Sequence, residues 1–285
     1  MEEMKQNSMA QERRKAFQAL DLSDDFLFGK VMTDPEVCRV TLEKILGVPI
    51  RKVTIPATEH VIDLLHDSKG IRLDVYVADE KGDVYNCEMQ TSHNGELPRR
   101  SRYYHGCMDL DLINKGEAYE SLTKAFVIFI CTFDPFGQGR HIYTFRNVCE
   151  EIPHLLLGDD SYTIFLSTKG AADDVSDEMR AFLAYVENSS DAFVAGTDSD
   201  WVRQIHARVR KVKESRELEV EFMTLRMREM DKYKEGMADI NRLYAYLLDH
   251  DMYDELKRSV SDKEYQWELL RTFSAEQQTA TNAAR

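Results

Sequence analysis

The sequence predicts an α/β protein with a mixed central sheet flanked by helices, followed by an α-helical C-terminal region. Segments rich in Val, Ile, Tyr, Phe and Thr and bounded by turn residues indicate strands. These segments are 52–58, 72–79, 83–91, 124–133, 141–148 and 161–167. After about residue 170 the pattern becomes helical, over 177–188, 198–235, 238–250 and the stretch after Ser261. This change of pattern divides the chain into a core and a helical region.

The length and composition fit this division. A chain of 285 residues with 43% hydrophobic residues can bury one full core and still carry an accessory region. We expect a flexible segment over 1–20, an α/β domain over 21–170 and a helical region over 171–272. The small polar residues over 273–285 predict a frayed tail.

The helices of the core are predicted from their end signals. Asp34 followed by Pro35 is typical of a helix start, and Gly47 supplies the matching stop. Apolar residues repeat at helical spacing between them, so this helix has one face to bury. A second helix is expected over about 98–114, between the strand over 83–91 and the next strand.

The segment over 124–133, KAFVIFICTF, predicts the central strand because it is almost continuously apolar. A strand of this kind is buried on both faces, so helices should cover both sides of the sheet. In the C-terminal region, Ser261 and Glu264 predict a capping box, and Gly236 is expected to interrupt the long helix.

The composition argues against several classes of protein. A net charge of -14 is unsuited to coating nucleic acid indiscriminately, because phosphate binding depends on Lys and Arg. The chain has no apolar run of about 18 residues, and its charged start lacks the hydrophobic centre of a signal peptide. We therefore expect a soluble, cytoplasmic protein with no membrane partner. Its five cysteines include no CxxC pair, and we expect them to be reduced.

Two basic clusters interrupt the acidic background. The first basic cluster comprises Arg99, Arg100 and Arg102. It lies at the start of the helix that follows the strand over 83–91, where its side chains can meet DNA phosphates. The second basic cluster comprises Arg203, Arg208, Arg210, Lys211 and Lys213. A solvated helix face is the ordinary explanation for the second cluster.

The segment IRLDVYVADEKGDVYNCEMQ predicts a β-hairpin with a three-residue loop that ends at Gly82. The ladder is then symmetric about Lys81, which places Asp74 opposite Glu88. Because side chains alternate along strands, Asp74, Glu88 and Gln90 share one polar face of the hairpin. The other face is apolar.

Two opposed carboxylates on adjacent strands repel each other, and a bound cation removes this conflict. Mg²⁺, with Mn²⁺ as a substitute, prefers oxygen ligands and takes one or two protein carboxylates. Asp74 and Glu88 supply these, the Met89 carbonyl offers a third oxygen, and Gln90 can orient a water that the metal acidifies. The alternative is that these side chains lie on a solvent-exposed face of the hairpin and have no catalytic role. The apolar strand over 124–133 favours a covered cleft instead, and like charges in a cleft are candidate functional groups.

Five segments occur in an order and at spacings that a known family shares. They are DDFLFGKVM (24–32), RLDVYVAD (72–79), CEMQ (87–90), RRSRYYHG (99–106) and YESLTKAFVIFI (119–130). On these segments the chain resembles the PD-(D/E)XK nuclease family transposases, also called recombination-promoting nucleases of the Rpn type, over about residues 23–167. The resemblance implies a PD-(D/E)XK restriction-endonuclease-like core and a nuclease that acts on DNA and promotes recombination.

The resemblance also implies roles for individual residues. The family's catalytic aspartate, the glutamate of its ExQ motif and the glutamine that replaces the superfamily's usual lysine match Asp74, Glu88 and Gln90. The family's first helix can supply another acidic metal ligand, for which Glu43 is the matching residue. A solvated helix position explains Glu43 equally well. Asp25 falls in the family's opening D-x-x-F segment, and a helix cap is its alternative explanation.

Other residues have ordinary structural explanations. Tyr104 lies at core spacing on its helix, so we expect it to pack, and we reserve phosphate contact for the arginines. His105 and His141 lack ligand spacing and are expected to be satisfied or exposed. The apolar stripe from Trp201 to Val212 is expected to pack on the core, with a homodimer contact as the alternative.

The leading hypothesis is therefore a Mg²⁺-dependent DNA endonuclease. Asp74 and Glu88 would bind the metal, Gln90 would position the water, and the first basic cluster would hold the DNA strand. A second hypothesis is a nuclease fold that no longer cuts and acts as an adaptor through its helical C-terminal region. The acidic balance and the uncharged Gln90 favour it. A third, a metal-free sensor with the same fold, has no positive feature in its favour.

Overall fold

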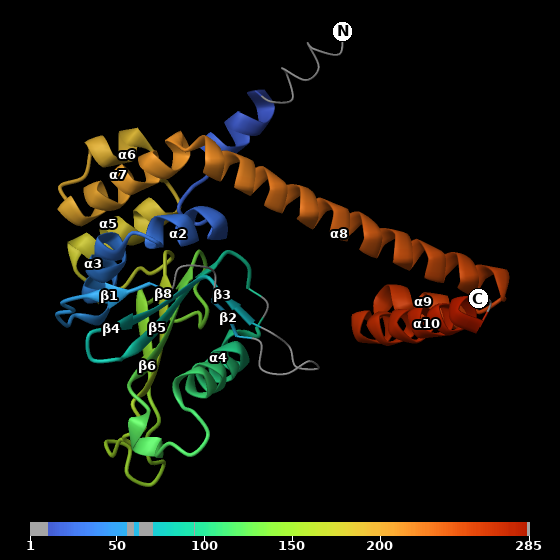
Figure 1. Ribbon diagram of the computed structural model, residues 1–285, viewed down its shortest axis with the longest axis horizontal. Coiled ribbons are helices and arrows are strands. Elements are labelled where there is room, and N and C mark those ends of the chain that lie inside the picture. Colours follow the sequence, from blue (N-terminus) through green and yellow to red (C-terminus); the bar gives the residue numbers. More distant parts are fainter. Residues whose placement is uncertain (1–10, 56–59, 63–70, 94, 284–285) are drawn as a thin grey trace. The chain divides into compact units, whose positions relative to one another are not determined.

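The computed structural model of the chain describes residues 11–55, 60–62, 71–93 and 95–283. The chain divides after Glu219 into two units. The first unit contains a mixed sheet with flanking helices, and the second is helical (Figure 1). The predicted fold class, an α/β core followed by a helical region, is confirmed.

The central sheet has six strands in the order β1-β4-β5-β6-β8-β7. The pairs β5/β6 and β6/β8 are parallel and the other pairs are antiparallel, so the sheet is mixed as predicted. Its strands are β1 (Val53–Thr54), β4 (Val75–Asp79), β5 (Val84–Gln90), β6 (Ala125–Cys131), β7 (Ile142–Phe145) and β8 (Ser161–Ser167). Strands β2 (His60–Ile62) and β3 (Ile71–Leu73) form a separate antiparallel pair. Residues 56–58 of the predicted first strand lie outside the described residues.

The β4–β5 hairpin has the predicted register. Its pairs run from Ala78↔Val84 to Val75↔Cys87, and each pair is symmetric about Lys81. Gly82 has a φ of 82°, the left-handed conformation that the loop requires. Asp74 itself is a bend residue between β3 and β4, so it lies one position beyond the last ladder pair.

Strand β6 is the centre of the sheet and is buried on both faces. Helix α4 (Leu97–Leu112) packs on one face, where Tyr76, Tyr104, Met108 and Phe129 belong to one apolar cluster. On the other face, helix α2 (Asp25–Met32) contacts β5. Both sides of the sheet are therefore covered, as the apolar β6 predicted.

Helices α2 (Asp25–Met32) and α3 (Pro35–Leu46) follow their predicted signals. The Asp34 side chain accepts hydrogen bonds from the backbone of Glu36 and Val37, and Gly47 closes α3 in the left-handed conformation. The described residues also form the short 3₁₀ helix η1 (Tyr119–Ser121) and further helices after the sheet. They are α5 (Asp177–Val186), α6 (Asp191–Ala195), α7 (Asp200–Glu214), α8 (Arg216–Asp249) and α9 (Tyr253–Ser261), and the final helix is α10 (Lys263–Ala283).

Helix α7 packs against α2, α3 and α5 in the first unit (Figure 1). Its apolar stripe is buried: Trp201 stacks on Phe182 with ring centroids 4.4 Å apart, and its indole N–H donates to Thr41 Oγ1 at 3.3 Å. The packing explanation for this stripe is confirmed, and the stripe is not a free surface for a homodimer. Helices α5–α7 thus belong with the sheet, whereas the helical region was expected to begin at residue 171.

The predicted helix ends of the second unit are partly wrong. Helix α8 continues through Gly236, and the break comes earlier, at Ser215, whose hydroxyl accepts from the backbone of Leu218. Asp262, rather than Ser261, caps α10 by accepting from the N–H of Tyr265 at 3.1 Å. Ser261 is the last residue of α9 and donates to carbonyls of that helix.

The expectations for the chain ends and the cysteines can also be compared with the structure. Residues 11–18 are helical and Phe17 is fully buried, so the flexible N-terminal segment does not extend to residue 20. Helix α10 reaches Ala283, so the expected tail is helical to that residue. All five cysteines are free, as predicted. Among the described helices, none is both long and apolar enough to span a membrane.

Candidate active site

The acidic pair of the hairpin is brought together as predicted. The backbone N–H of Asp74 donates to Oε1 of Glu88 at 3.2 Å, and the N–H of Met89 donates to Oδ2 of Asp74 at 3.3 Å. Each carboxylate is therefore tied to the strand segment that carries the other one. Helix α2 lies directly behind, because a Cβ on Gly29 would be 3.7 Å from the Asp74 carbonyl oxygen.

Glu88 is almost completely buried, with 2% of its surface exposed. Burial first, and then the charge of Asp74, raise the pKa of Glu88 to about 8. Hydrogen bonds from the Asp74 backbone and Asn86, together with the charge of Arg100, oppose this rise. The alternative of a solvated hairpin face is excluded, since α4 covers this side of the strand.

Gln90 and Glu88 share a partner on α4. Arg100 Nη1 donates to Gln90 Oε1 at 2.9 Å, and Arg100 Nη2 donates to Glu88 Oε2 at 3.2 Å. The Tyr104 hydroxyl accepts from the same Nη2 at 2.7 Å and donates to Glu88 Oε2 at 3.3 Å. Tyr104 packs in the core as predicted, but its hydroxyl also reaches the site. Core spacing predicts only where the ring lies, so this contact of the hydroxyl could not be predicted from the sequence.

Asn86 is a second site residue that the sequence did not single out. It lies two positions before Glu88 on the same face of β5 and is fully buried. Its Nδ2 donates to Glu88 Oε1 at 3.1 Å, and its Oδ1 has no hydrogen-bond partner among the described residues. A buried amide oxygen without a donor is costly. The alternation of β5 was the signal that places it beside Glu88.

These groups fit a small divalent cation. Two carboxylates form an all-oxygen donor pair, which is the chemistry that Mg²⁺ and Mn²⁺ prefer. A cation would also relieve the repulsion that raises the pKa of Glu88. Among the described residues, no group of three or more His, Cys, Asp or Glu side chains could hold a metal ion. The protein would therefore supply two carboxylates and leave the other positions to water and substrate.

The structure does not bring Glu43 or Asp25 into this pair. Glu43 Oε1 accepts from the N–H of Ile50 at 2.7 Å, and its Oε2 lies 2.6 Å from Arg39 Nη1. Both oxygens of Glu43 thus stabilise the end of α3. Asp25 is an exposed residue in the first turn of α2, and the cap of that helix is Asp24.

The basic clusters separate into different environments. Arg99 and Arg102 are exposed on α4, whereas Arg100 is half-buried and turns toward the site. In the second basic cluster, Arg203, Arg210 and Lys211 are exposed, as expected for a solvated helix face. Its other members are partly buried, and desolvation lowers the pKa of Lys213.

The two histidines are satisfied, as predicted. His105 lies 3.0 Å from Thr163 Oγ1 and 3.2 Å from Ser161 Oγ, and burial lowers the pKa of His105 to about 4. His141 Nδ1 lies 2.8 Å from Asp174 Oδ1. Neither set of partners includes a residue of the acidic pair.

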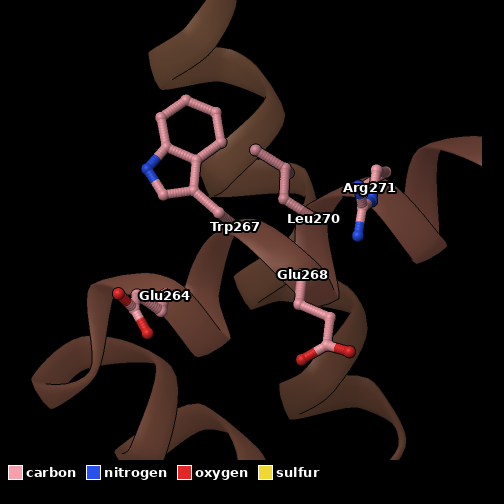
Figure 2. A pocket seen from close by; sticks show the side chains of 5 residues that line it. All are labelled: Glu264, Trp267, Glu268, Leu270 and Arg271. Atoms are coloured by element: carbon pink, nitrogen blue, oxygen red, sulfur yellow. The ribbon is translucent and has the colours of Figure 1, made fainter. Parts of the chain in front are cut away.

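Two cavities lie away from the acidic pair. A cavity of about 680 Å³ is lined by Trp267, Leu270 and three charged residues of α10 (Figure 2). A polar cavity of about 320 Å³ lies on the first unit beside His206 and Lys213. Neither is lined by Asp74, Glu88 or Gln90, so neither belongs to the candidate active site.

A mixed sheet whose hairpin carries an acidic pair, with a polar residue two positions further on and a helix across the face, defines a fold of the PD-(D/E)XK class. The chain belongs to the PD-(D/E)XK nuclease family transposases, because the model of that family matches residues 22–174, more than half of its length. The resemblance found in the sequence is thereby confirmed. No curated protein and no solved structure matches the chain significantly.

Proposed function

We propose that the chain is a Mg²⁺-dependent endonuclease that hydrolyses phosphodiester bonds of DNA, with Mn²⁺ as a substitute metal. The observation that carries this proposal is the acidic pair of the buried Glu88 and the partly buried Asp74, each of which accepts a backbone hydrogen bond from the segment that carries the other. Two carboxylates in this arrangement have little value for stability and suit a divalent cation.

Each residue of the site has a role in the proposed reaction. Asp74 and Glu88 hold the cation, and the buried Asn86 fixes the orientation of the Glu88 carboxylate. A bound divalent ion supplies an acidified water and neutralises charge on the phosphodiester. Gln90 carries no charge, and its amide orients the attacking water or a phosphate oxygen by hydrogen bonding.

DNA is the proposed substrate because the family is one of nuclease transposases. Because the net charge of the chain is -14, DNA must be bound by a local group of basic side chains. Arg99 and Arg102 are exposed on α4, the helix that covers the acidic pair, and are suited to contact backbone phosphates there. We propose that cleavage promotes recombination or transposition.

The test is cleavage of plasmid and linear DNA by the nuclease-free protein with Mg²⁺, Mn²⁺ or EDTA. Asp74→Ala and Glu88→Ala should each reduce cleavage to background while leaving the circular dichroism spectrum unchanged. Glu120→Ala, at an exposed position outside the site, is the matched control and should cut normally. Cleavage that survives both site substitutions would overturn the proposal, as would the absence of metal-dependent cleavage by the native protein.

The alternative is an inactive nuclease fold that acts as an adaptor. Two observations favour it: Gln90 is uncharged, and Met227, Met230 and Met237 are exposed along one side of α8. Calorimetric titration with Mn²⁺ separates the two functions. Binding that disappears in Glu88→Gln supports the enzyme, and no binding in either protein supports the adaptor.

A further inference from the structure

Arg100 differs from its basic neighbours on α4 because its guanidinium faces the acidic pair. It donates to Gln90 Oε1, Glu88 Oε2 and the Tyr104 hydroxyl at 2.9, 3.2 and 2.7 Å. The guanidinium carbon also lies 5.3 Å from the ring centre of Tyr104 and 5.8 Å from that of Phe129. A planar group held by hydrogen bonds and two aromatic rings has little freedom to move.

This contact fixes the orientation of Gln90. An arginine has donors only, so the atom of Gln90 that faces Nη1 must be the amide oxygen. The Nε2 amide group is therefore the free end of the side chain. It can donate to an oxygen of a water or a phosphate, but it brings no charge.

The charge of the site also points to a role for Arg100. Asp74 and Glu88 contribute negative charge, and a phosphodiester and an attacking hydroxide would add more. Positive charge held in place before the reaction lowers the cost of this build-up. Among the hydrogen-bond partners that the described residues supply to Glu88 and Gln90, the positive group is Arg100.

We propose that Arg100 is a positioning residue of the reaction, which orients Gln90 and Glu88 and supplies the fixed positive charge that Gln90 lacks. This inference rests on the proposed nuclease function. It separates Arg100 from Arg99 and Arg102, which face outward and bind the DNA backbone. Tyr104 assists by holding both Arg100 and Glu88 through its hydroxyl.

The experiment compares three variants with the native protein: Arg100→Met, Arg100→Lys and a double variant. The double variant carries both Gln90→Lys and Arg100→Met, which moves the positive charge onto β5. Arg102→Met removes an outward charge from the same helix, and Lys115→Met removes an exposed charge beyond it. Steady-state cleavage, Mn²⁺ affinity by calorimetry and DNA affinity in EDTA at several salt concentrations are measured for each protein.

We expect Arg100→Met to lower kcat by about 100-fold and to change the KM for DNA little. The kcat of Arg100→Lys should be about tenfold below that of the native protein, and the kcat of the double variant should be about tenfold above that of Arg100→Met. Arg102→Met should instead raise KM and reduce the salt dependence of DNA binding by about one ion. Lys115→Met should behave as the native protein.

Mn²⁺ affinity distinguishes this role from a merely structural one. Measured above the pKa of Glu88, where its proton does not compete with the metal, removing a fixed positive charge beside the carboxylates should tighten Mn²⁺ binding by about threefold or more, while cleavage falls. A collapsed site would lose both together. Weaker Mn²⁺ binding in Arg100→Met, or a kcat within about twofold of native, overturns the inference.

The outcomes also separate this inference from the proposed function. If the native protein does not cut DNA, the proposed function fails, and the Mn²⁺ titration still decides whether Arg100 sets the charge of the site. If Arg100→Met does not fold, Arg100→Lys carries the test. An Arg100→Lys protein that folds, binds Mn²⁺ and cuts with a kcat within about twofold of native then overturns the inference.

Discussion

The backbone N–H of Asp74 donates a hydrogen bond to the Glu88 carboxylate, and the N–H of Met89 returns one to Asp74. The two acids are thus held near each other by main-chain atoms on both sides. Side-chain rotation away from the site would break these bonds, so the repulsion between the carboxylates is built into the hairpin. The raised pKa of Glu88 reflects this constraint together with burial.

The first prediction concerns stability without metal. Burial and Asp74 raise the pKa of Glu88 to about 8, whereas the unfolded value is near 4.5. The folded protein therefore holds this proton more tightly, and the stability that follows is present at low pH and lost as pH rises through 8. Glu88→Gln stays neutral and should not show this loss. Relative to native, it should gain up to about 4 kcal/mol between pH 5 and pH 8.5.

Urea unfolding in EDTA at pH 5, 7 and 8.5 measures this difference. Glu120→Gln, an exposed position, provides the control and should track the native protein at each pH. Parallel pH profiles for native and Glu88→Gln would contradict the prediction, because they would mean that Glu88 titrates alike in the folded and unfolded chains.

The second prediction links metal binding to protons. At pH 6.5, below the raised pKa of Glu88, a cation that binds Glu88 must displace its proton. The affinity for Mn²⁺ should rise by roughly tenfold per pH unit below pH 8 and level off above it. Calorimetry in two buffers of different ionisation enthalpy should give close to one proton released at pH 6.5. A proton count near zero would show that the cation does not bind through Glu88.

The hairpin and the first helices could be predicted because their signals are local. Gly82 is the residue of the loop that adopts a positive φ without strain, and this one position sets the register that brings Asp74 to Glu88. Asp34 and Gly47 likewise mark the ends of α3 by hydrogen bonds within a few residues. The apolar β6 predicted burial on both faces, which made the covered site predictable as well.

The remainder of the site could not be predicted, because it depends on how α4 is rotated on the sheet. The sequence places Arg99, Arg100 and Arg102 within one turn and cannot say which side chain faces inward. The rotation that buries Tyr104 and Met108 also directs Arg100 to Glu88. Two helix ends were missed for different reasons. Gly236 was taken as a break but lies inside α8, and the break comes at the hydroxyl cap Ser215. Asp262 was missed because the adjacent Ser261 offers the same kind of cap.

The third prediction tests the loop that sets the register. Gly82 has a φ of 82°, and a Cβ there would lie 3.4 Å from the Thr123 side chain. Gly82→Ala should therefore destabilise the protein by about 1 kcal/mol or more, and Gly82→Asn by less, because Asn tolerates this conformation. Gly106→Ala is the matched control. It lies inside α4 with open space around its Cβ position, and it should stabilise by about 0.5–1 kcal/mol. Equal effects of the two alanines in urea unfolding would contradict the assigned loop conformation.

The fourth prediction concerns acid sensitivity. Burial lowers the pKa of His105 to about 4, against the opposing effects of the Asp159 charge and a backbone hydrogen bond of Tyr162, while an unfolded histidine titrates near 6.5. Between these pH values the unfolded chain binds a proton at His105 and the folded chain does not. The free energy of unfolding therefore decreases as pH falls from 6.5 toward 4. The loss should reach up to about 3 kcal/mol at the lower end. His105→Gln, which cannot take up the proton and keeps an amide beside Ser161 and Thr163, should remove this part of the pH dependence.

Native and His105→Gln proteins are compared by urea unfolding at pH 4.5, 5.5 and 7. Because Glu88 acts with the opposite sign over the same range, the comparison is repeated in the Glu88→Gln background. If His105→Gln leaves the slope of unfolding free energy against pH unchanged in the Glu88→Gln background, His105 is protonated in the folded protein.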